Sequence, residues 1–433
     1  MWQSVESSVG LGGPVSFVPR SVGRLDYGKC GERSVLDSNF DLDAIQRAIA
    51  DAGFDGWLFY DFRGSDPIAR KILQLSQDVV STRRWFYYIP SVGEPIRIVH
   101  AIEPTKLDAL PGEAEIYVSW SSLQETIDRV LHGARRIAMQ YSPRNEVPYI
   151  SRVDAGTVEL IRSCDVQVVS SADLVQQFDA TLTDTQLESH RRAAKILRSL
   201  VDELFDSIRS ATIDGEHQTE RSLLDWLLRR LHDHDLVFDH EPIVAVNVHT
   251  ADPHFTVSES ASSAIAEGDL VLVDVWAKER ALGSIYADIT WTAFVGREVP
   301  AEIDGVFQVV RDARRTVVDE IGEAVRHGRP IRGHELDRVA RDFIERAGYG
   351  EFFIHRTGHS IHEEGHGNGA NLDDLETHDT RRILPRTLFS VEPGIYLPQR
   401  FGIRSEVDVY HAGDHIEVTG EPHQNVLLPL LAD

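Results

Sequence analysis

The chain has 433 residues, 42% hydrophobic and 26% charged, which is the balance of a globular protein too long for one ordinary core. Its formal net charge of -25 repels nucleic acid and anionic membranes, so neither is an expected partner. The two cysteines, Cys30 and Cys164, exclude a disulfide framework and fit a reducing compartment. We find neither an apolar run near the roughly 20 residues of a membrane span nor a secretory signal, so a cytoplasmic location is expected.

The first part of the chain predicts a disordered extension followed by an α/β domain. Residues 1–38 are rich in Ser and Gly and show no period. Order is expected to begin near Phe40, with Asp41 or Asp43 capping a helix around 44–52. Between 39 and 178, short apolar runs alternate with helical stretches, which predicts a mixed sheet with helices. Its strands are expected at 56–60, 85–89, 96–100, 116–120 and 136–140.

A second domain, residues 179–433, is expected to begin where Thr183 or Asp184 can cap a helix. Apolar residues at helical spacing predict this helix through Leu197 to Ile208, and a second one through Leu223 to Leu231. Further helices are expected at 303–327 and 334–347. Further strands are expected at 242–248, 270–276, 285–294, 387–391, 395–397, 404–410 and 415–418.

Four lone carboxylates stand in these apolar strands. A buried carboxylate is costly unless a positive charge meets it, and each one alone is more readily read as a salt bridge or an edge-strand residue. Together they indicate a shared cation, and one added imidazole favours Mn, Co, Fe or Zn. Such a set is too large for one tetrahedral ion and suits two ions that share ligands. The predicted ligands are Asp274, Asp288, His359, Glu392 and Glu406.

Several motifs carry a resemblance to a known family. They are Gly358-His359 with His366 after it, Val391-Glu392-Pro393-Gly394, Gly402-Ile403-Arg404-Ser405-Glu406, and Ala251–Phe255 ahead of Gly268–Asp274. From about 180 to 430 the chain resembles the pita-bread metallopeptidases, which include methionine aminopeptidase, prolidase and aminopeptidase P. The first domain resembles the one that precedes the catalytic domain in prolidase, aminopeptidase P and creatinase. The resemblance implies a curved antiparallel sheet flanked by helices.

The resemblance also implies roles for the ligands. Asp274 would chelate one ion, Asp288 and Glu406 would bridge both, and His359 and Glu392 would complete the other. A water between the ions would be the nucleophile. Glu392 would also move a proton towards the leaving nitrogen.

Four further residues are assigned to the substrate by the same resemblance. His254 and His366 would hydrogen-bond the substrate carbonyl or the developing oxyanion, although each could be an ordinary loop histidine. Arg404 would offer its fork to a substrate carboxylate, or would only neutralise the carboxylates. His355 would face the substrate or support a ligand. If Arg404 is instead locked on Asp408 or Glu363, a peptide carboxylate loses its partner.

The chain departs from the family at three places. The first two ligands are 288 − 274 = 14 positions apart, and the family has a slightly tighter hairpin there. Trp276 and His362 stand where small residues are expected. Trp276 could narrow the pocket, and the longer hairpin could reshape its entrance.

We therefore expect a metal-dependent hydrolase of C–N bonds, acting on Xaa-Pro peptides as a dipeptidase or an aminopeptidase. Two divalent ions are expected as cofactors, manganese first, with Co, Zn or Fe as alternatives. A non-peptide C–N hydrolase or a lyase on the same fold is the alternative function. A homodimer is predicted from the resemblance and from the aromatic stretch Arg83–Tyr88, which could equally be a core strand.

Overall fold

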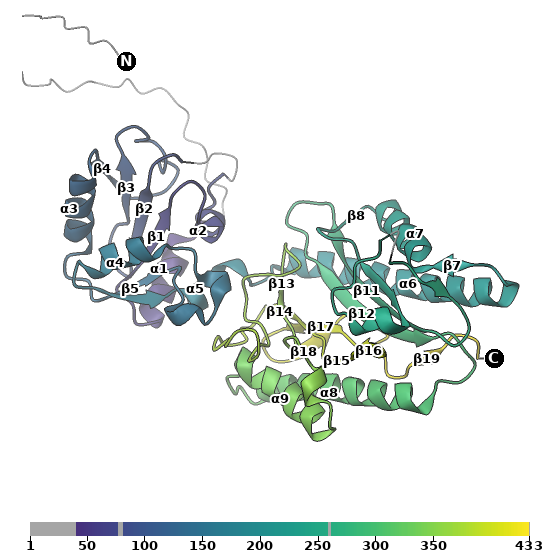
Figure 1. The fold of residues 1–433 in the computed structure, drawn as a ribbon. Helices are drawn as coiled ribbons and strands as arrows, with labels where there is room; N and C mark the ends of the chain where they lie inside the picture. The colour runs from purple at the N-terminus through teal and green to yellow at the C-terminus, as the bar shows by residue number, and fades with distance from the viewer. Residues whose placement is uncertain (1–39, 77–80, 259–260, 433) are drawn as a thin grey trace, which may run out of the picture.

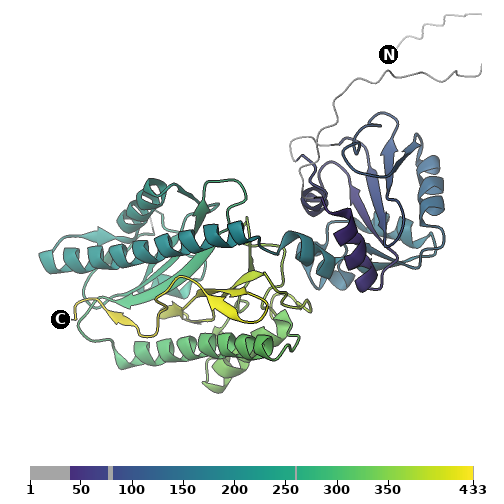
Figure 2. The ribbon, with the colours of Figure 1, turned by 180° about the vertical axis from the view of Figure 1, so that it is seen from behind.

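The computed structural model describes residues 40–76, 81–258 and 261–432. The predicted disordered extension, residues 1–38, lies outside the described residues. Figure 1 shows the chain folding into two parts, with the C-terminal part built around its own strands and helices. Figure 2 shows the same arrangement from behind. Across the described ranges, no helix has both the length and the apolar character needed to cross a bilayer.

The first part is a six-stranded mixed sheet in the order β4-β3-β2-β1-β5-β6. Alternate residues of β1 point to opposite faces, and both faces are buried. Trp57 and Phe59 pack with α1, α2 and α5, whereas Leu58 and Tyr60 pack with α3 and α4. The strands are β1 (Gly56–Asp61), β2 (Trp85–Pro90), β3 (Ile96–His100), β4 (Glu113–Tyr117), β5 (Arg136–Met139) and β6 (Gln167–Ser170). The helices are α1 (Leu42–Asp51), α2 (Pro67–Ile72), α3 (Trp120–Leu131), α4 (Ala155–Arg162) and α5 (Ala172–Asp179).

Most predicted elements of this part are confirmed, including the helix capped by Asp41, whose side chain accepts from the Ala44 amide. The strand predicted at 116–120 is wrong in its bounds. β4 ends at Tyr117, and Ser119 then caps α3. The aromatic residues from Trp85 to Tyr88 are buried in β2 between β1 and β3. This stretch is a core strand, so it gives no support to a dimer surface.

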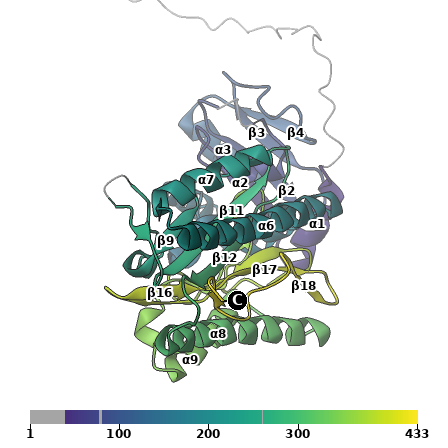
Figure 3. The same ribbon diagram turned by 90° about the vertical axis from the view of Figure 1, so that its right-hand side faces the viewer.

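The second part has two helix-covered layers of strands, seen edge-on in Figure 3. One hydrophobic core joins α6 (Asp184–Asp214) and α7 (Glu220–Asp233) to β9 (Ile243–Val246), β11 (Leu270–Glu279) and β12 (Ala287–Phe294). The other joins α8 (Ala301–Arg326) and α9 (Gly333–Arg346) to β14 (Leu388–Val391), β15 (Gly394–Leu397), β16 (Phe401–Arg404) and β17 (Val407–His411). The shorter strands are β7 (Gln218–Thr219), β8 (Leu236–Val237), β10 (Ala264–Ile265), β13 (Ser360–Ile361), β18 (Ile416–Val418) and β19 (Leu428–Pro429).

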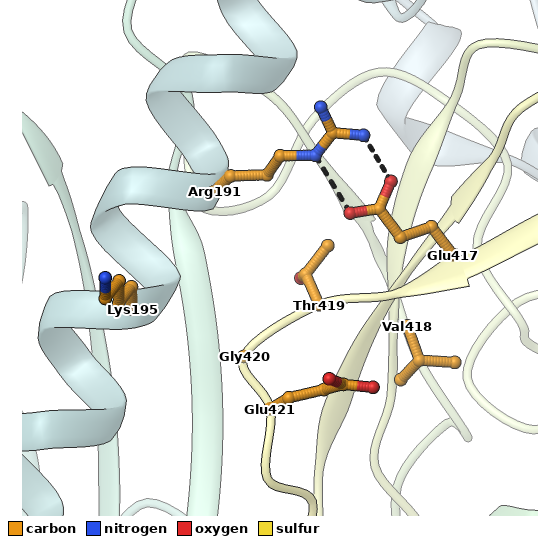
Figure 4. Close-up of a pocket in the computed structure, with 7 residues that line it drawn as sticks. All are labelled: Arg191, Lys195, Glu417, Val418, Thr419, Gly420 and Glu421. Atoms are coloured by element: carbon orange, nitrogen blue, oxygen red, sulfur yellow. Dashed lines mark hydrogen bonds and ion pairs between the residues drawn. The ribbon is translucent and has the colours of Figure 1, made fainter.

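Polar contacts attach these layers to each other. The Asp288 amide in β12 donates to Asp408 in β17 at 2.9 Å. On the outer side, Arg191 of α6 donates through Nε to Glu417 of β18 at 2.9 Å. Figure 4 shows this ion pair beside a hollow that Lys195 and Glu421 also line. None of the predicted site residues lines that hollow.

The helices of this part begin close to their predicted positions, and Thr183 caps α6 by accepting from the Gln186 amide. The single strand predicted at 404–410 is wrong, because Ser405 and Glu406 interrupt it between the end of β16 and the start of β17. Glu392 likewise lies just after β14, not within a strand. Two of the four predicted carboxylates are therefore at strand ends.

The first prediction concerns the core under α6. Leu197 is 0% exposed there, whereas Leu282 in the β11–β12 turn is fully exposed. We expect Leu197→Ala to lower the free energy of unfolding by about 2–5 kcal/mol, since it removes buried methyl groups and leaves a cavity. Leu282→Ala is the matched control, with an expected change within about 0.5 kcal/mol. Urea unfolding followed by circular dichroism measures both, and equal losses would contradict the assignment of this core.

Candidate metal centre

The hairpin of β11 and β12 brings the first two predicted ligands to one face. Asp274 is paired with Thr290, and Trp276 with Asp288. Residues directly opposite in an antiparallel pair point the same way, as do residues two apart. Asp274 and Asp288 therefore share a face, and both are buried. The longer hairpin turn does not separate them, because the extra residues follow β11 and precede β12.

Thr290 links this hairpin to the fourth carboxylate. Its hydroxyl oxygen lies 2.7 Å from Asp274 Oδ1 and 2.7 Å from Glu406 Oε2. A hydroxyl has one proton to donate, so it can serve only one of the two carboxylates at a time. The break between β16 and β17 is what turns Glu406 towards Thr290, whose carbonyl accepts from the Glu406 amide at 3.4 Å.

His359 and Glu392 are placed by Ser390 at the end of β14. The His359 amide donates to Ser390 Oγ at 3.0 Å, and that hydroxyl donates to Glu392 Oε1 at 3.1 Å. The approach is close, since a Cβ on Gly358 would lie 2.0 Å from the Ser390 carbonyl oxygen. Only glycine fits at the position before His359. The Nε2 atom of His359 lies 3.4 Å from Glu392 Oε1 and 3.7 Å from Asp288 Oδ2.

The protonation of His359 suits a ligand. Its Nδ1 lies 3.2 Å from the Ser360 carbonyl oxygen, a contact that needs the proton on Nδ1 and leaves the Nε2 lone pair facing the carboxylates. Burial lowers the pKa of His359 well below its usual value. The ring is therefore neutral, which is the form that binds a metal.

The residues present fit a cation. Ligand atoms of Asp288, His359 and Glu406 all lie within 4.8 Å of one another. Asp288 Oδ1 and Glu406 Oε1 are buried without a hydrogen-bond partner among the described residues, which is rare for buried polar atoms and suits oxygens that bind a cation. Burial raises the pKa of both carboxyls well above the usual range. Repulsion from neighbouring carboxylates raises it further, chiefly from Asp274 in the case of Asp288 and from Asp288 in the case of Glu406. Burial also raises the pKa of Glu392 to about 7.

Arg404 is held inside the protein. It forms an ion pair with Asp274 through NH2, its Nε donates to Thr290 Oγ1 at 3.0 Å, and NH1 donates to the Tyr396 hydroxyl at 3.2 Å. Asp408 and Glu363, the two acidic residues considered as alternative partners of Arg404, are not its partners in these contacts. A guanidinium with all three nitrogens engaged is not poised as a free clamp, so its geometry is that of a group that neutralises and orients Asp274.

His355 occupies a supporting position. Its Nε2 lies 2.8 Å from the Tyr396 hydroxyl and its Nδ1 lies 2.7 Å from the Arg356 carbonyl oxygen. The Tyr396 hydroxyl can therefore accept from Arg404 and donate to His355. Of the two roles predicted for His355, the contacts match support of the centre, because both ring nitrogens are already engaged.

The two histidines predicted to face substrate lie at the exposed side of the centre. The His366 ring packs edge-on against the His359 ring, with centroids 4.3 Å apart. His254 follows the short helix Asn247–Ala251 and comes directly after Pro253, whose carbonyl accepts from Arg404 at 3.3 Å. Both side chains are exposed. They are free to meet a ligand that approaches the carboxylates.

Sequence reasoning missed several residues of the centre. Asp408 accepts from the Asp288 amide, and its other oxygen is buried without a hydrogen-bond partner. It is a fifth lone carboxylate in an apolar strand, so the signal that found the others also applied to it. Ser390 gave no such signal, because serine is common in strands and loops. Arg356 is buried, and its charge lowers the pKa of Glu392.

Asp337 on α9 was also missed. It is fully buried and accepts from the Thr357 amide at 2.9 Å and the Thr357 hydroxyl at 2.7 Å. The Thr357 carbonyl in turn accepts from the Glu392 amide at 2.8 Å. Helix α9 thus anchors the segment that leads to His359. Only the three-dimensional structure reveals these contacts.

The geometry of this centre agrees with comparison to known proteins. The chain matches metallopeptidase family M24 over residues 188–411, which is more than half of its length. This chain belongs to metallopeptidase family M24. The matched range contains all five predicted ligands.

Curated relatives of this M24 protein are distant in sequence. It is 27% identical over 274 residues to the probable dipeptidase PepE of Mycobacterium bovis, a match that covers 60% of this chain and 64% of that relative. It is 27% identical over 239 residues to the Xaa-Pro dipeptidase of Pyrococcus furiosus, covering 54% of this chain and 61% of that one. The match thus spans less than two thirds of the length of these relatives.

Solved structures show the fold over most of the chain. A prolidase from Thermococcus sibiricus superposes with a TM-score of 0.59 at 21% identity, covering 91% of this chain and 100% of that one. Dipeptidase PepE from Mycobacterium ulcerans superposes with a TM-score of 0.61 at 22% identity, covering 90% of this chain and 97% of that one. An X-prolyl aminopeptidase from Caenorhabditis elegans superposes with a TM-score of 0.57 at 16% identity, covering 90% of this chain and 63% of that one. That protein is described as cytosolic with a di-nuclear active site. The predicted pita-bread fold is confirmed.

The second prediction concerns Thr290. Thr290→Val keeps the shape of the side chain but removes the hydroxyl that contacts Asp274, Glu406 and Arg404. We expect Mn²⁺ affinity to fall about 10- to 100-fold, because groups that orient ligands contribute on that scale. Calorimetric titration of Mn²⁺ measures it. Thr316→Val on α8, whose hydroxyl bonds only its own helix, is the control, and an equal affinity loss there would contradict a specific role.

Proposed function

We propose that this M24 protein is a dinuclear metal-dependent peptidase that cleaves Xaa-Pro peptide bonds. The observation that carries the proposal is the convergence of Asp288, His359 and Glu406 within 4.8 Å, with two of their buried oxygens unpartnered. Asp274 and Glu392 contact the same group through Thr290 and His359. The names of the distant relatives, two of them dipeptidases, support the substrate class.

The proposed ligands are the five residues found from sequence, and Mn²⁺ is the proposed ion. Two such ions supply a polarised substrate carbonyl and an acidified water near neutral pH. The chain's own contributions are separate. Glu392 lies at the edge of the group with one oxygen held by Ser390, so it is placed to carry a proton between water and the leaving nitrogen. His254 and His366 would donate to the carbonyl oxygen from the exposed side.

Arg404 supports a second candidate. Because its three nitrogens are engaged by Asp274, Thr290 and Tyr396, it is not available as the carboxylate clamp that a dipeptide would need. A longer peptide, or a non-peptide substrate of C–N hydrolysis or elimination, has no such need. The same metal centre therefore accommodates the alternative of a non-peptide hydrolase or lyase.

Three further statements belong to this proposal. Residues 39–178 and 179–433 are proposed as the N-terminal and catalytic domains, the protein is proposed to act in the cytoplasm, and it is proposed to form a homodimer. Each follows the predictions from sequence. Sedimentation velocity at micromolar concentration tests the last, and a sole species with the mass of one chain would reject it.

The third prediction tests the metal and the activity together. The purified chain is stripped with a chelator, reloaded with Mn²⁺, Co²⁺ or Zn²⁺ singly, and assayed on Xaa-Pro dipeptides and on longer Xaa-Pro peptides. We expect two bound ions per chain and cleavage only after reloading. The length of the accepted peptides separates a dipeptidase from an aminopeptidase.

Asp288→Ala is the variant for the same experiment. We expect it to abolish cleavage and to reduce the bound metal, because it removes a carboxylate from the centre of the group. Ile213→Ala, at an exposed position near the end of α6, should behave as the unaltered chain. Bound metal without any peptide cleavage would reject the peptidase and leave the hydrolase or lyase alternative.

A further inference from the structure

One segment carries both a proposed ligand and a proposed substrate contact. Residues 359–371, called the histidine loop here, begin at His359 and include His366. Most of this loop has no regular secondary structure, and only Ser360–Ile361 forms a strand. Hydrogen bonds within the loop include those from the Gly367 amide to the Ser360 carbonyl at 2.7 Å and from the Gly369 amide to Ser360 Oγ at 3.0 Å. From the same part of the chain, the Tyr286 amide donates to the His362 carbonyl at 3.0 Å.

Helix α5, the last helix of the first part, holds the far end of the histidine loop. Gln176 Oε1 accepts from the Ala370 amide at 2.7 Å. Asp179 Oδ2 accepts from Asn368 Nδ2 at 2.7 Å. Both acceptors are buried, where a lost partner costs the full desolvation of the group left behind. The loop is thus fixed by side chains from outside its own layer of the fold.

Lys71 on helix α2 completes the arrangement. Its Nζ lies 2.7 Å from Asp179 Oδ1, and the Asp179 side chain is fully buried. The same Nζ lies 3.5 Å from His362 Nδ1, in the middle of the histidine loop. Burial and the Lys71 charge lower the pKa of His362 to about 3, so the ring is neutral and its lone pair can face the ammonium group.

His362 is one of the places where this chain departs from the family pattern. A small residue there could not reach α2, whereas the imidazole, only 5% exposed, fills the space between the loop and Lys71. The neighbouring packing is tight: a Cβ on Gly369 would lie 3.1 Å from the Ala180 side chain. The loop and the first part of the chain therefore fit each other closely at this point.

We propose that Lys71, Gln176 and Asp179 are positioning residues that clamp the histidine loop, so that the first part of the chain sets the placement of His366 and His359. The inference rests on the proposed function for the meaning of those two histidines. A displacement of about 1 Å at a reacting group can cost on the order of 100-fold in rate. The clamped residues, His362, Asn368 and Ala370, lie two to four residues from His366, which is close enough to control such a displacement.

The fourth prediction tests the clamp with Lys71→Met, Asp179→Asn and the double variant. Hydrogen exchange of peptides that cover 360–371 is measured on the full chain without added metal. We expect exchange there to become roughly tenfold faster or more, as for the loss of a hydrogen bond to a charged group. Protection of the α6 and α8 amides against hydrogen exchange should stay unchanged. Lys195→Met is the matched control, because Lys195 is exposed on α6 beside the hollow in Figure 4.

The kinetic arm uses the Mn²⁺-loaded chain. We expect each single variant to lower kcat/KM on the order of 10- to 100-fold, and the double variant to be no worse than the poorer single one, since both remove the same ion pair. Additive losses would overturn the coupling. Unchanged exchange at 360–371, or protection lost throughout the chain, would overturn the clamp. If the unaltered chain cleaves no peptide, the proposed function fails, while the exchange data still decide the clamp.

Discussion

Three buried carboxyl groups, Asp274, Asp288 and Glu406, and the partly exposed Glu392 repel each other. The rest of the second part of the chain can be understood from how that repulsion is contained. Isolated carboxylates do not stay ionised in a protein interior. Here burial and mutual repulsion raise the pKa of Asp288 and Glu406, and one guanidinium, Arg404, is drawn in against Asp274. A second buried guanidinium, Arg356, also lowers the pKa of Glu392. The unpartnered oxygens of Asp288 and Glu406 show where further positive charge belongs.

The two helix-covered layers make this concentration of charge possible. Each layer has its own apolar core, so the strands can present acidic side chains at the seam without exposing their hydrophobic faces. The seam is joined by polar contacts such as the Asp288 amide with Asp408. Proposed ligands from both layers meet there: Asp274 and Asp288 come from the hairpin of β11 and β12, and Glu392 and Glu406 come from the segments that flank β15 and β16. Displacing one layer against the other would separate the pairs.

The lone carboxylates and the long helices could be predicted from the sequence, for a physical reason. Asp274 stands alone in an apolar strand, and a residue that violates the surrounding pattern is either an error of assignment or a functional group. The long helices α6 and α8 were found because their apolar spacing is sustained over many turns. The break at Ser405 and Glu406 was not found, because two polar residues between apolar ones look like normal strand alternation.

The groups that hold the ligands were the hardest to predict. Ser390, Thr357 and Asp337 act through hydrogen bonds between segments far apart in sequence, and no local pattern encodes such pairing. Arg404 shows the same limit in another form. Its motif identified it as important, but whether its fork faces substrate or Asp274 depends on the depth of the strand in the fold. In the structure the side chain is buried and paired with Asp274.

The contacts of the histidine loop give the first part of the chain a role beyond covering one side of the catalytic part. A loop that carries a ligand must be rigid on the scale of a bond length, yet its glycines, Gly365, Gly367 and Gly369, lower the cost of moving it. Rigidity therefore has to come from outside the loop. Asp179 provides it by holding Asn368 while itself held by Lys71. Because a buried carboxylate needs its cation, loss of either partner weakens the hold on the Asn368 end of the loop, where Arg381 also donates to the Asn368 carbonyl. The geometry of the proposed metal centre is in this way tied to the docking of α2 and α5.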